Sequence, residues 1–360
     1  MPLDILLDSL HKRVPWSAMK AMLKMCNLPI GRGWVNTIEK LRAESKTGNT
    51  LIDNFAQLKD LYCNHLLVGE KAIKLFSADR KTLDNLIVLL QNIELKQTIF
   101  HDTFPFPLSP QRLEELEDKT PELVEIKDFN DNLVLVFCTK RTFTERTELN
   151  PKELSPEVQK DLGYYDKLVG TKEYNRQFFD IVVLWKKKDL VEIRIDIANE
   201  MLLPDRIKAF SQIASNFNNL VGELSGLQTL FKNPVNLFPL IDSLYHSNEG
   251  KVVEIAFTTD EGSIKSEKMR RGFVDLRKET YHNAGKQAVD HITLYRLAIL
   301  WDCPIVDGIK TQPELFLPSQ NRSLSSVEQH LDEVLVTKCA GLIDYNFIFE
   351  KINTYLNDGS

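Results

Sequence analysis

The sequence FFDIVVLWKKKDLVEIRIDI, residues 178–197, contains the clearest β-hairpin signal in the chain. Phe178–Trp185 and Leu190–Ile197 are rich in β-branched and aromatic residues, and the polar run between them is typical of a connecting turn. In the second strand apolar residues alternate with Glu192, Arg194 and Asp196. Such alternation predicts a strand with one polar face in an antiparallel sheet.

Strands and helices are also predicted on both sides of this hairpin. Apolar residues at helical spacing predict helices throughout residues 1–120, and Ser109-Pro110 has the form of a helix N-cap followed by proline at the first helical position. We expect a polar connection with one short helix over 145–163, and a capping box at Ser325 and Glu328. The other expected elements are strands at Leu123–Lys127, Leu133–Thr139, Lys251–Thr258 and Ile292–Trp301, and helices at Pro204–Leu224 and Tyr345–Leu356.

This order of elements predicts an α+β protein. Its length of 360 residues exceeds the usual size of one domain, so we expect a helical domain at 1–120, β-hairpins with a long amphipathic helix at 121–230, and a mixed α+β domain at 231–360. The five cysteines are far apart and form no Cys-x-x-Cys pair, which argues against a disulfide framework or a thiolate zinc site. No apolar run reaches the roughly 18 residues of a membrane span. These features favour the cytoplasm or nucleus.

A basic segment near the N-terminus stands out in a chain of net charge -6. Two apolar stripes at helical spacing, Trp16 to Cys26 and Trp34 to Leu41, flank a turn with Pro29, Gly31 and Gly33. Only Glu39 and Glu44 oppose the cations, which are Lys12, Arg13, Lys20, Lys24, Arg32, Lys40, Arg42 and Lys46. A local excess of this kind favours an anionic partner.

Over residues 13–45 this pattern resembles the SAP-type module, a small two-helix DNA-binding unit. The residues that match are the Leu23–Leu28 run, Pro29, Gly31, and the later Ile38 and Leu41. The resemblance implies that Arg32 and the start of the second helix approach the phosphate backbone, where helix N–H groups and a cation suit an anion.

A second basic cluster lies between residues 265 and 286, beside Tyr281 and His282. Cations interleaved with aromatic side chains are typical of surfaces that bind nucleic acid. The cations proposed to contact phosphate here are Lys268, Arg270, Arg271 and Arg277.

The hairpin also contains a candidate for metal-dependent nuclease chemistry. Asp180 and Glu192, followed by Arg194, have the spacing at which restriction-type nucleases hold a divalent metal on neighbouring strands. Two registers are open. A four-residue loop pairs Val183 with Glu192 and turns Asp180 away from Glu192, whereas a three-residue loop sets Asp180 opposite Arg194. The side chain of Arg194 suits a phosphate but does not give up a proton.

These observations favour a non-enzymatic binding protein with DNA or RNA as one partner and another protein as a second. Arg13, Lys20, Lys24, Arg32 and Lys40 would contact phosphate. One alternative is a protein-interaction or structural subunit without nucleic-acid contact, and another is the nuclease that uses Asp180 and Glu192. The chain contains no Walker-type loop, no Gly-x-Gly-x-x-Gly and no His-Glu-x-x-His, so no cofactor or metal is expected.

Overall fold

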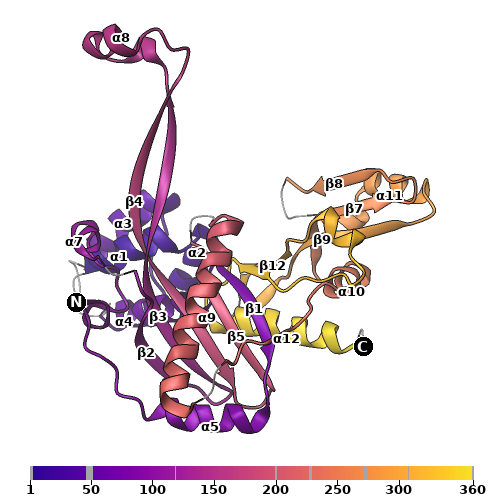
Figure 1. Cartoon of the computed structure of the whole chain (residues 1–360), viewed down its shortest axis with the longest axis horizontal. Helices are drawn as coiled ribbons and strands as arrows, with labels where there is room; N and C mark the ends of the chain where they lie inside the picture. Colours follow the sequence, from indigo (N-terminus) through magenta and orange to yellow (C-terminus); the bar gives the residue numbers. More distant parts are fainter. Residues whose placement is uncertain are drawn as a thin grey trace.

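The protein is built on one large antiparallel sheet with helices on both faces (Figure 1). The computed structural model describes residues 3–45, 52–117, 119–198, 201–226, 229–270, 274–306 and 308–358. In sheet order the strands are β2 (Glu122–Asp128), β3 (Asn132–Leu149), β4 (Leu168–Trp185), β5 (Leu190–Asp196), β1 (Lys71–Ser77), β13 (Val334–Thr337), β12 (Glu314–Leu317), β9 (Ile292–Leu300), β7 (Lys251–Thr259) and β8 (Ile264–Lys268). The short β6 (Asn233–Pro234) pairs with β1. The predicted α+β class is confirmed.

The β4–β5 hairpin lies near the middle of the sheet, and its register is now fixed. Val183 pairs with Glu192, and Ile181 pairs with Arg194, as the four-residue loop requires. Glu192, Arg194 and Asp196 therefore share a face with Ile181 and Val183. The side chain of Asp180 points to the opposite face.

The expectation that residues 1–120 are helical throughout is wrong for β1. This strand lies between β5 and β13 in the sheet, although Lys71 and Lys74 interrupt its apolar residues. It is buried on both faces, so it lacks the alternation that marks a half-exposed strand. Strands from all three predicted segments, 1–120, 121–230 and 231–360, lie side by side in this one sheet.

Two helical layers cover the sheet. One face carries α5 (Arg80–Gln91) and α9 (Leu203–Ser225), whose buried residues pack on Leu135, Val182 and Ile193. The opposite face is covered by α1 (Leu3–Arg13), α2 (Trp16–Met25), α3 (Gly33–Ser45), α4 (Ile52–Val68), α10 (Leu240–His246) and α12 (Leu342–Asp358). The two predicted helices of the basic segment and the long helix at 204–224 are confirmed by α2, α3 and α9.

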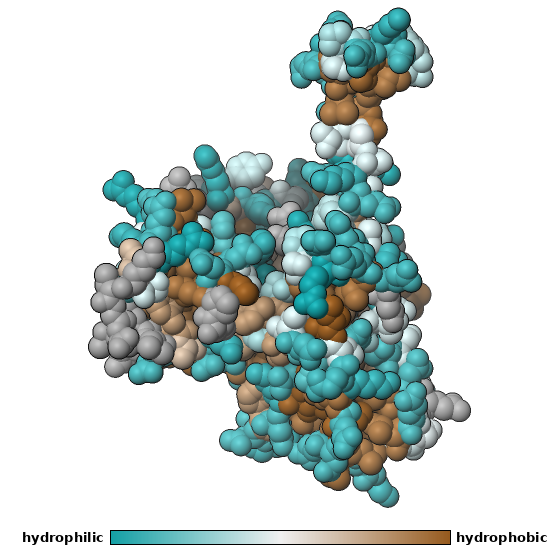
Figure 2. Space-filling model, turned by 90° about the vertical axis from the view of Figure 1, so that its left-hand side faces the viewer, coloured by the Kyte–Doolittle hydropathy of each residue, from teal (hydrophilic) through white to brown (hydrophobic). Residues whose placement is uncertain are grey.

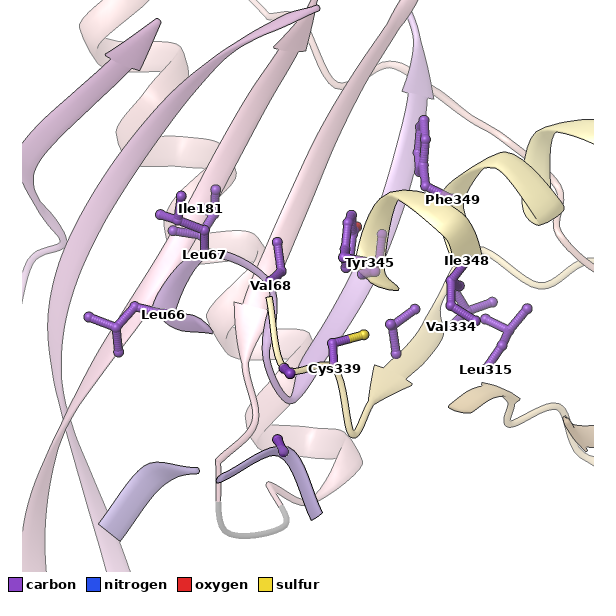
Figure 3. Packing of buried hydrophobic residues seen from close by; sticks show 14 of the residues in the cluster. Leu66, Leu67, Val68, Ile181, Leu315, Val334, Cys339, Tyr345, Ile348 and Phe349 are labelled. Carbon is purple, nitrogen blue, oxygen red and sulfur yellow. The ribbon is translucent and has the colours of Figure 1, made fainter. Parts of the chain in front are cut away.

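The last helix, α12, crosses the centre of the sheet and joins its two halves. Figure 3 shows Tyr345, Ile348 and Phe349 packed among side chains from the end of α4, β4, β12 and β13. Phe349 stacks on Trp185 with ring centroids 4.2 Å apart and planes 4° from parallel. The C-terminal helix is thus part of the main core.

The shorter helices show how far local signals were reliable. Ser109 caps α7 (Pro110–Glu115) by accepting from the backbone N–H of Arg112, as predicted. The capping box at Ser325 and Glu328 was wrong, because only a 3₁₀ turn, η4 (Asn321–Ser325), forms there and no helix follows. The remaining short elements are α6 (Ile99–Thr103), α8 (Pro156–Leu162), α11 (Thr280–Gln287), η2 (Pro151–Glu153), η3 (Leu276–Lys278) and the separate pair β10 (Cys303–Val306) and β11 (Ile309–Thr311).

A two-stranded arm projects from the sheet (Figure 1). We define the arm as residues 144–173, in which the outer halves of β3 and β4 pair only with each other and α8 forms the head. The expected connection over 145–163 is therefore mostly strand and helix. Figure 2 shows apolar residues gathered where the head meets the two strands, whereas the outer surface of the head is mostly hydrophilic. The exposed large apolar residues there are Leu149, Val158, Tyr164, Tyr165 and Val169.

Removing the arm should leave the rest of the fold stable. The side chains of residues 144–173 form hydrogen bonds and an ion pair with other residues of the arm, such as Asn150 with Glu153 and Lys167 with Glu148. Phe143 pairs with Tyr174, so an Asn-Gly turn in place of the arm closes the hairpin. We expect the melting temperature, followed by circular dichroism, to change by less than about 3 °C. A much larger loss would show that the arm helps to hold the sheet together.

Candidate functional site

The hairpin acids proposed as nuclease residues are buried and fully engaged. Asp180 and Glu192 are both 0% exposed, and Arg194 is 2% exposed. Arg194 binds Glu192 through two parallel contacts of 2.9 Å, and Trp185 Nε1 and the Tyr345 hydroxyl also donate to Glu192. Burial alone would lower the pKa of Arg194, but the charge of Glu192 and the contacts with Glu192 and Tyr345 raise it.

Asp180 lies on the other face of the sheet, where it cannot share a metal ion with Glu192. Its carboxylate pairs with Arg141 and accepts from Thr139 Oγ1 at 3.1 Å and from the backbone N–H of Asp196 at 3.0 Å. A catalytic Mg²⁺ needs converging oxygens and room for water. Neither condition is met at this hairpin, so the acids hold the fold together.

A third buried acid, Asp196, gathers two cations at the point where β4 and β5 separate. Arg13 Nη1 lies 2.9 Å from Asp196 Oδ2, and Lys71 donates to the carbonyl of Phe179 at 2.8 Å. Burial alone would raise the pKa of Asp196, but Lys71, Arg13 and two backbone N–H groups lower it to about 2. For Lys71 the effect of burial prevails and lowers the pKa of its ammonium group to about 8.

Two of the predicted phosphate contacts are therefore internal. The side chain of Arg13 is 12% exposed, donates to Asp196 and the Gln177 carbonyl, and stacks over Phe179. Arg277 is 14% exposed, pairs with Asp275, and donates to backbone carbonyls between residues 244 and 250. Both guanidinium groups are committed within the fold, so we remove them from the proposed contacts.

The other predicted cations do not converge on one surface. Arg32 is exposed just before α3, and Lys40 is exposed within it. Lys40 donates to the Ile30 carbonyl at 3.2 Å. Lys268 pairs with Glu254 at 2.7 Å, and Arg270 follows it, exposed, at the end of β8. Figure 1 places β8 in the lobe away from α3. Arg271 lies outside the described residues.

Lys20 and Lys24, in contrast, meet further lysines in a pocket. A hollow of about 270 Å³ lies between α2 and the β10–β11 hairpin. We call it the lysine pocket. Its lining residues are Ser17, Lys20, Ala21, Lys24, Asp302, Ile309, Lys310, Thr311, Gln312 and Lys338.

The charge of the lysine pocket is unbalanced. Its one carboxylate, Asp302, is engaged by Gln312 at 2.7 Å and by Lys251 at 3.2 Å, and these contacts lower its pKa. Lys338 pairs with Glu314. In the described part of the chain Lys20, Lys24 and Lys310 have no ion-pair partner. Three ammonium groups without an ion-pair contact, around one small hollow with a single acid, are suited to an anion with several oxygens.

Sequence reasoning missed Lys310 and Lys338, which lie about three hundred residues from α2 along the chain. The Asp307-Gly308 dipeptide was a usable signal, since it favours a tight hairpin that presents the next residues. Gly308 has φ of +74°, and Lys338 has φ of +63°, a conformation that non-glycine residues seldom adopt. The unusual backbone of Lys338 is held by its N–H, which donates to Glu70 at 2.7 Å.

Other kinds of site find little support. Among the residues that the structure describes, no three His, Cys, Asp or Glu side chains gather as metal ligands. The ring of His282 is buried and forms hydrogen bonds with the Tyr245 hydroxyl and Glu267. None of the described helices is long and apolar enough to cross a membrane. No protein-family model matches this sequence, and no curated protein is detectably similar to it.

Glu192→Ala should destabilise the protein strongly. It leaves Arg194 and the Tyr345 hydroxyl buried without their acceptor, a change that typically costs about 3–5 kcal/mol. Glu148→Ala is the matched control, because Glu148 forms an exposed pair with Lys167 that is worth at most about 1 kcal/mol. Urea unfolding measures both. A Glu192→Ala protein as stable as wild type would contradict the structural role of this acid.

Proposed function

We propose that the protein is a non-enzymatic nucleic-acid-binding protein that holds the phosphate backbone in the lysine pocket. The observation that carries the proposal is the convergence of Lys20 and Lys24 with Lys310 around a hollow whose one acid is already engaged. Lysine ammonium groups bind phosphate as point charges, without reading the bases. The expected binding is therefore independent of sequence.

The lysines repel one another in the free protein. Lys20 and Lys24 are four residues apart on α2, and like charges at this spacing cost about 0.2–0.5 kcal/mol in a helix. Lys310 adds a third charge from the facing hairpin. A bound phosphate would relieve this repulsion. The net charge of -6 also means that the chain as a whole does not attract polyanions, so any binding depends on such a local patch.

The SAP-type resemblance offers a second set of contacts on the same helix pair. Helices α2 and α3 would be the two helices of such a unit, and Arg32 is exposed just before α3 begins. Just before α3 the Gly31 N–H already donates to Thr37 Oγ1 at 2.9 Å, so this N–H is not free for a phosphate. We therefore place the main contacts in the lysine pocket and treat Arg32 and Lys40 as an extension of it.

The charge-reversal double variant Lys20→Glu with Lys24→Glu tests this. In gel shifts with single-stranded and duplex DNA and with RNA over a salt series, we expect wild-type affinity to fall steeply as salt rises. The variant should bind at least about tenfold more weakly, and its log–log salt slope should be smaller by about 0.7–0.9 for each lost phosphate contact.

Two further variants make the result decisive. Lys96→Glu with Lys208→Glu changes the same charge at exposed lysines outside the pocket and should bind as wild type does. Arg32→Glu with Lys40→Glu tests the extension on α3. Loss of binding only in this last variant would assign the contact to the SAP-type unit, and no binding by wild type at low salt would remove nucleic acid as a partner.

The arm favours a second function, as an interaction subunit. A two-stranded ribbon with an apolar head exposes Tyr164 at 74% and Val169 at 64%. Isolated ribbons of this kind are only marginally stable in water. Apolar side chains exposed together near the head of such an arm are typical of contacts with another protein.

Photo-crosslinking in cells distinguishes a bound arm from a solvated one. Benzoylphenylalanine in place of Tyr164 should give a protein adduct of discrete mass. The same replacement at Tyr281, which is 77% exposed on α11, is the control and should give none. Equal yields at both positions, or none at either, would contradict a partner at the arm.

A further inference from the structure

The inner half of β4 has an open edge. Its pairing with β5 ends at Ile181 and Arg194, whereas its pairing with β3 continues through the arm. The carbonyls of Gln177 and Phe179 accept hydrogen bonds from Arg13 and Lys71. These two carbonyls therefore point away from β3. Backbone groups alternate in direction along a strand, so those of Glu173 and Asn175 point the same way. In the described part of the chain no strand pairs with this edge between 173 and 177, where the Gln177 carbonyl is the one backbone group already used by a side chain, that of Arg13.

Two hollows meet along this edge, one on each face of the sheet. The first, of about 400 Å³, lies on the α9 face beside Phe143, Tyr174 and Phe178. The second, of about 470 Å³, lies on the opposite face beside Leu108 and Leu113. Arg176, Phe178 and Ala198 line both. An extended chain beside β4 would direct alternate side chains into the two hollows.

The walls of the hollows are predominantly basic. Their cations are Lys12, Arg13, Arg146 and Arg176, and their one acid is Asp205. Lys12 pairs with Asp8 and Arg13 with Asp196, whereas Arg146 and Arg176 have no ion-pair partner among the described residues. Arg176 stacks over Tyr174 at 5.0 Å, which holds its charge beside the edge. The edge is therefore complementary to an acidic segment.

We propose that an extended acidic peptide of a partner protein adds to the sheet as a strand along residues 173–177 of β4. Backbone hydrogen bonds to the open edge would supply affinity, and the two hollows would select the side chains. A nucleic-acid strand suits this edge less well, because it cannot satisfy alternating N–H and carbonyl groups. The site is separate from the lysine pocket, so either proposal can fail alone.

Fluorescence anisotropy with the full chain tests this, using a labelled peptide of alternating valine and glutamate. We expect binding that weakens at least about tenfold in Arg176→Glu. Lys172→Glu is the matched control, since Lys172 is exposed on the same strand and face but lies beyond the hollows. It should bind as wild type does. The same peptide with lysine for glutamate should not bind.

A second probe requires no change in the protein. The valine–glutamate peptide N-methylated at alternate residues retains its charges but loses the N–H groups on one edge, so it should bind at least about tenfold more weakly to wild type. Equal affinity of the two peptides would overturn strand addition. So would the absence of binding at millimolar peptide, or displacement of the bound peptide by an oligothymidylate.

Discussion

The buried carboxylate of Asp196 organises the junction of α1 with the strands β1, β4 and β5. It lies where β5 ends, accepts from the Phe179 N–H at 3.0 Å, and pairs with Arg13 at the end of α1. Because its side chain takes the place of a strand partner, β4 is released from β5 at this point and continues outward beside β3 alone. Lys71 from β1 completes the charge balance within the core. One acid thus ties a helix, three strands and the base of the arm, and its contacts offset the cost of burying charge.

Several arginines that the sequence places in basic runs or on the polar face of a strand are used inside the fold. Arginine has a planar group with five donors, which matches carboxylates and clustered carbonyls, and Arg13, Arg194 and Arg277 are used in this way inside the fold. Lysine is a compact, strongly hydrated charge, and Lys20, Lys24 and Lys310 remain at the surface. A basic run in the sequence therefore overstates the charge that reaches solvent. The lysine pocket contains basic side chains that are not used for contacts inside the fold.

The sequence contained the local structure but not the long-range contacts. The hairpin at 178–197, the helix at 204–224 and the cap at Ser109 depend on neighbouring residues, and all three are present. The sequence predicts a connection in place of the arm, because the strands of the arm are exposed on both faces and show no alternation of apolar residues. β1 was missed for the opposite reason, since it is buried on both faces. Lys310 lies near α2 only because the β10–β11 hairpin packs against that helix, and no local sequence pattern predicts this long-range contact.

The open edge of β4 differs from the two outer edges of the sheet. β8 and β2 end the sheet with charged side chains, Lys265, Glu267 and Lys268 on one and Glu122, Glu125 and Lys127 on the other, which is how proteins discourage unwanted strand pairing. Beside residues 173–177 the chain instead places two hollows, an aromatic wall and unpaired arginines. A strand edge that only has to avoid pairing with other strands does not require a hollow on each face of the sheet beside it. Because the same release of β4 from β5 creates both the arm and this edge, a partner bound along the edge would lie at the root of the arm and be positioned to contact both.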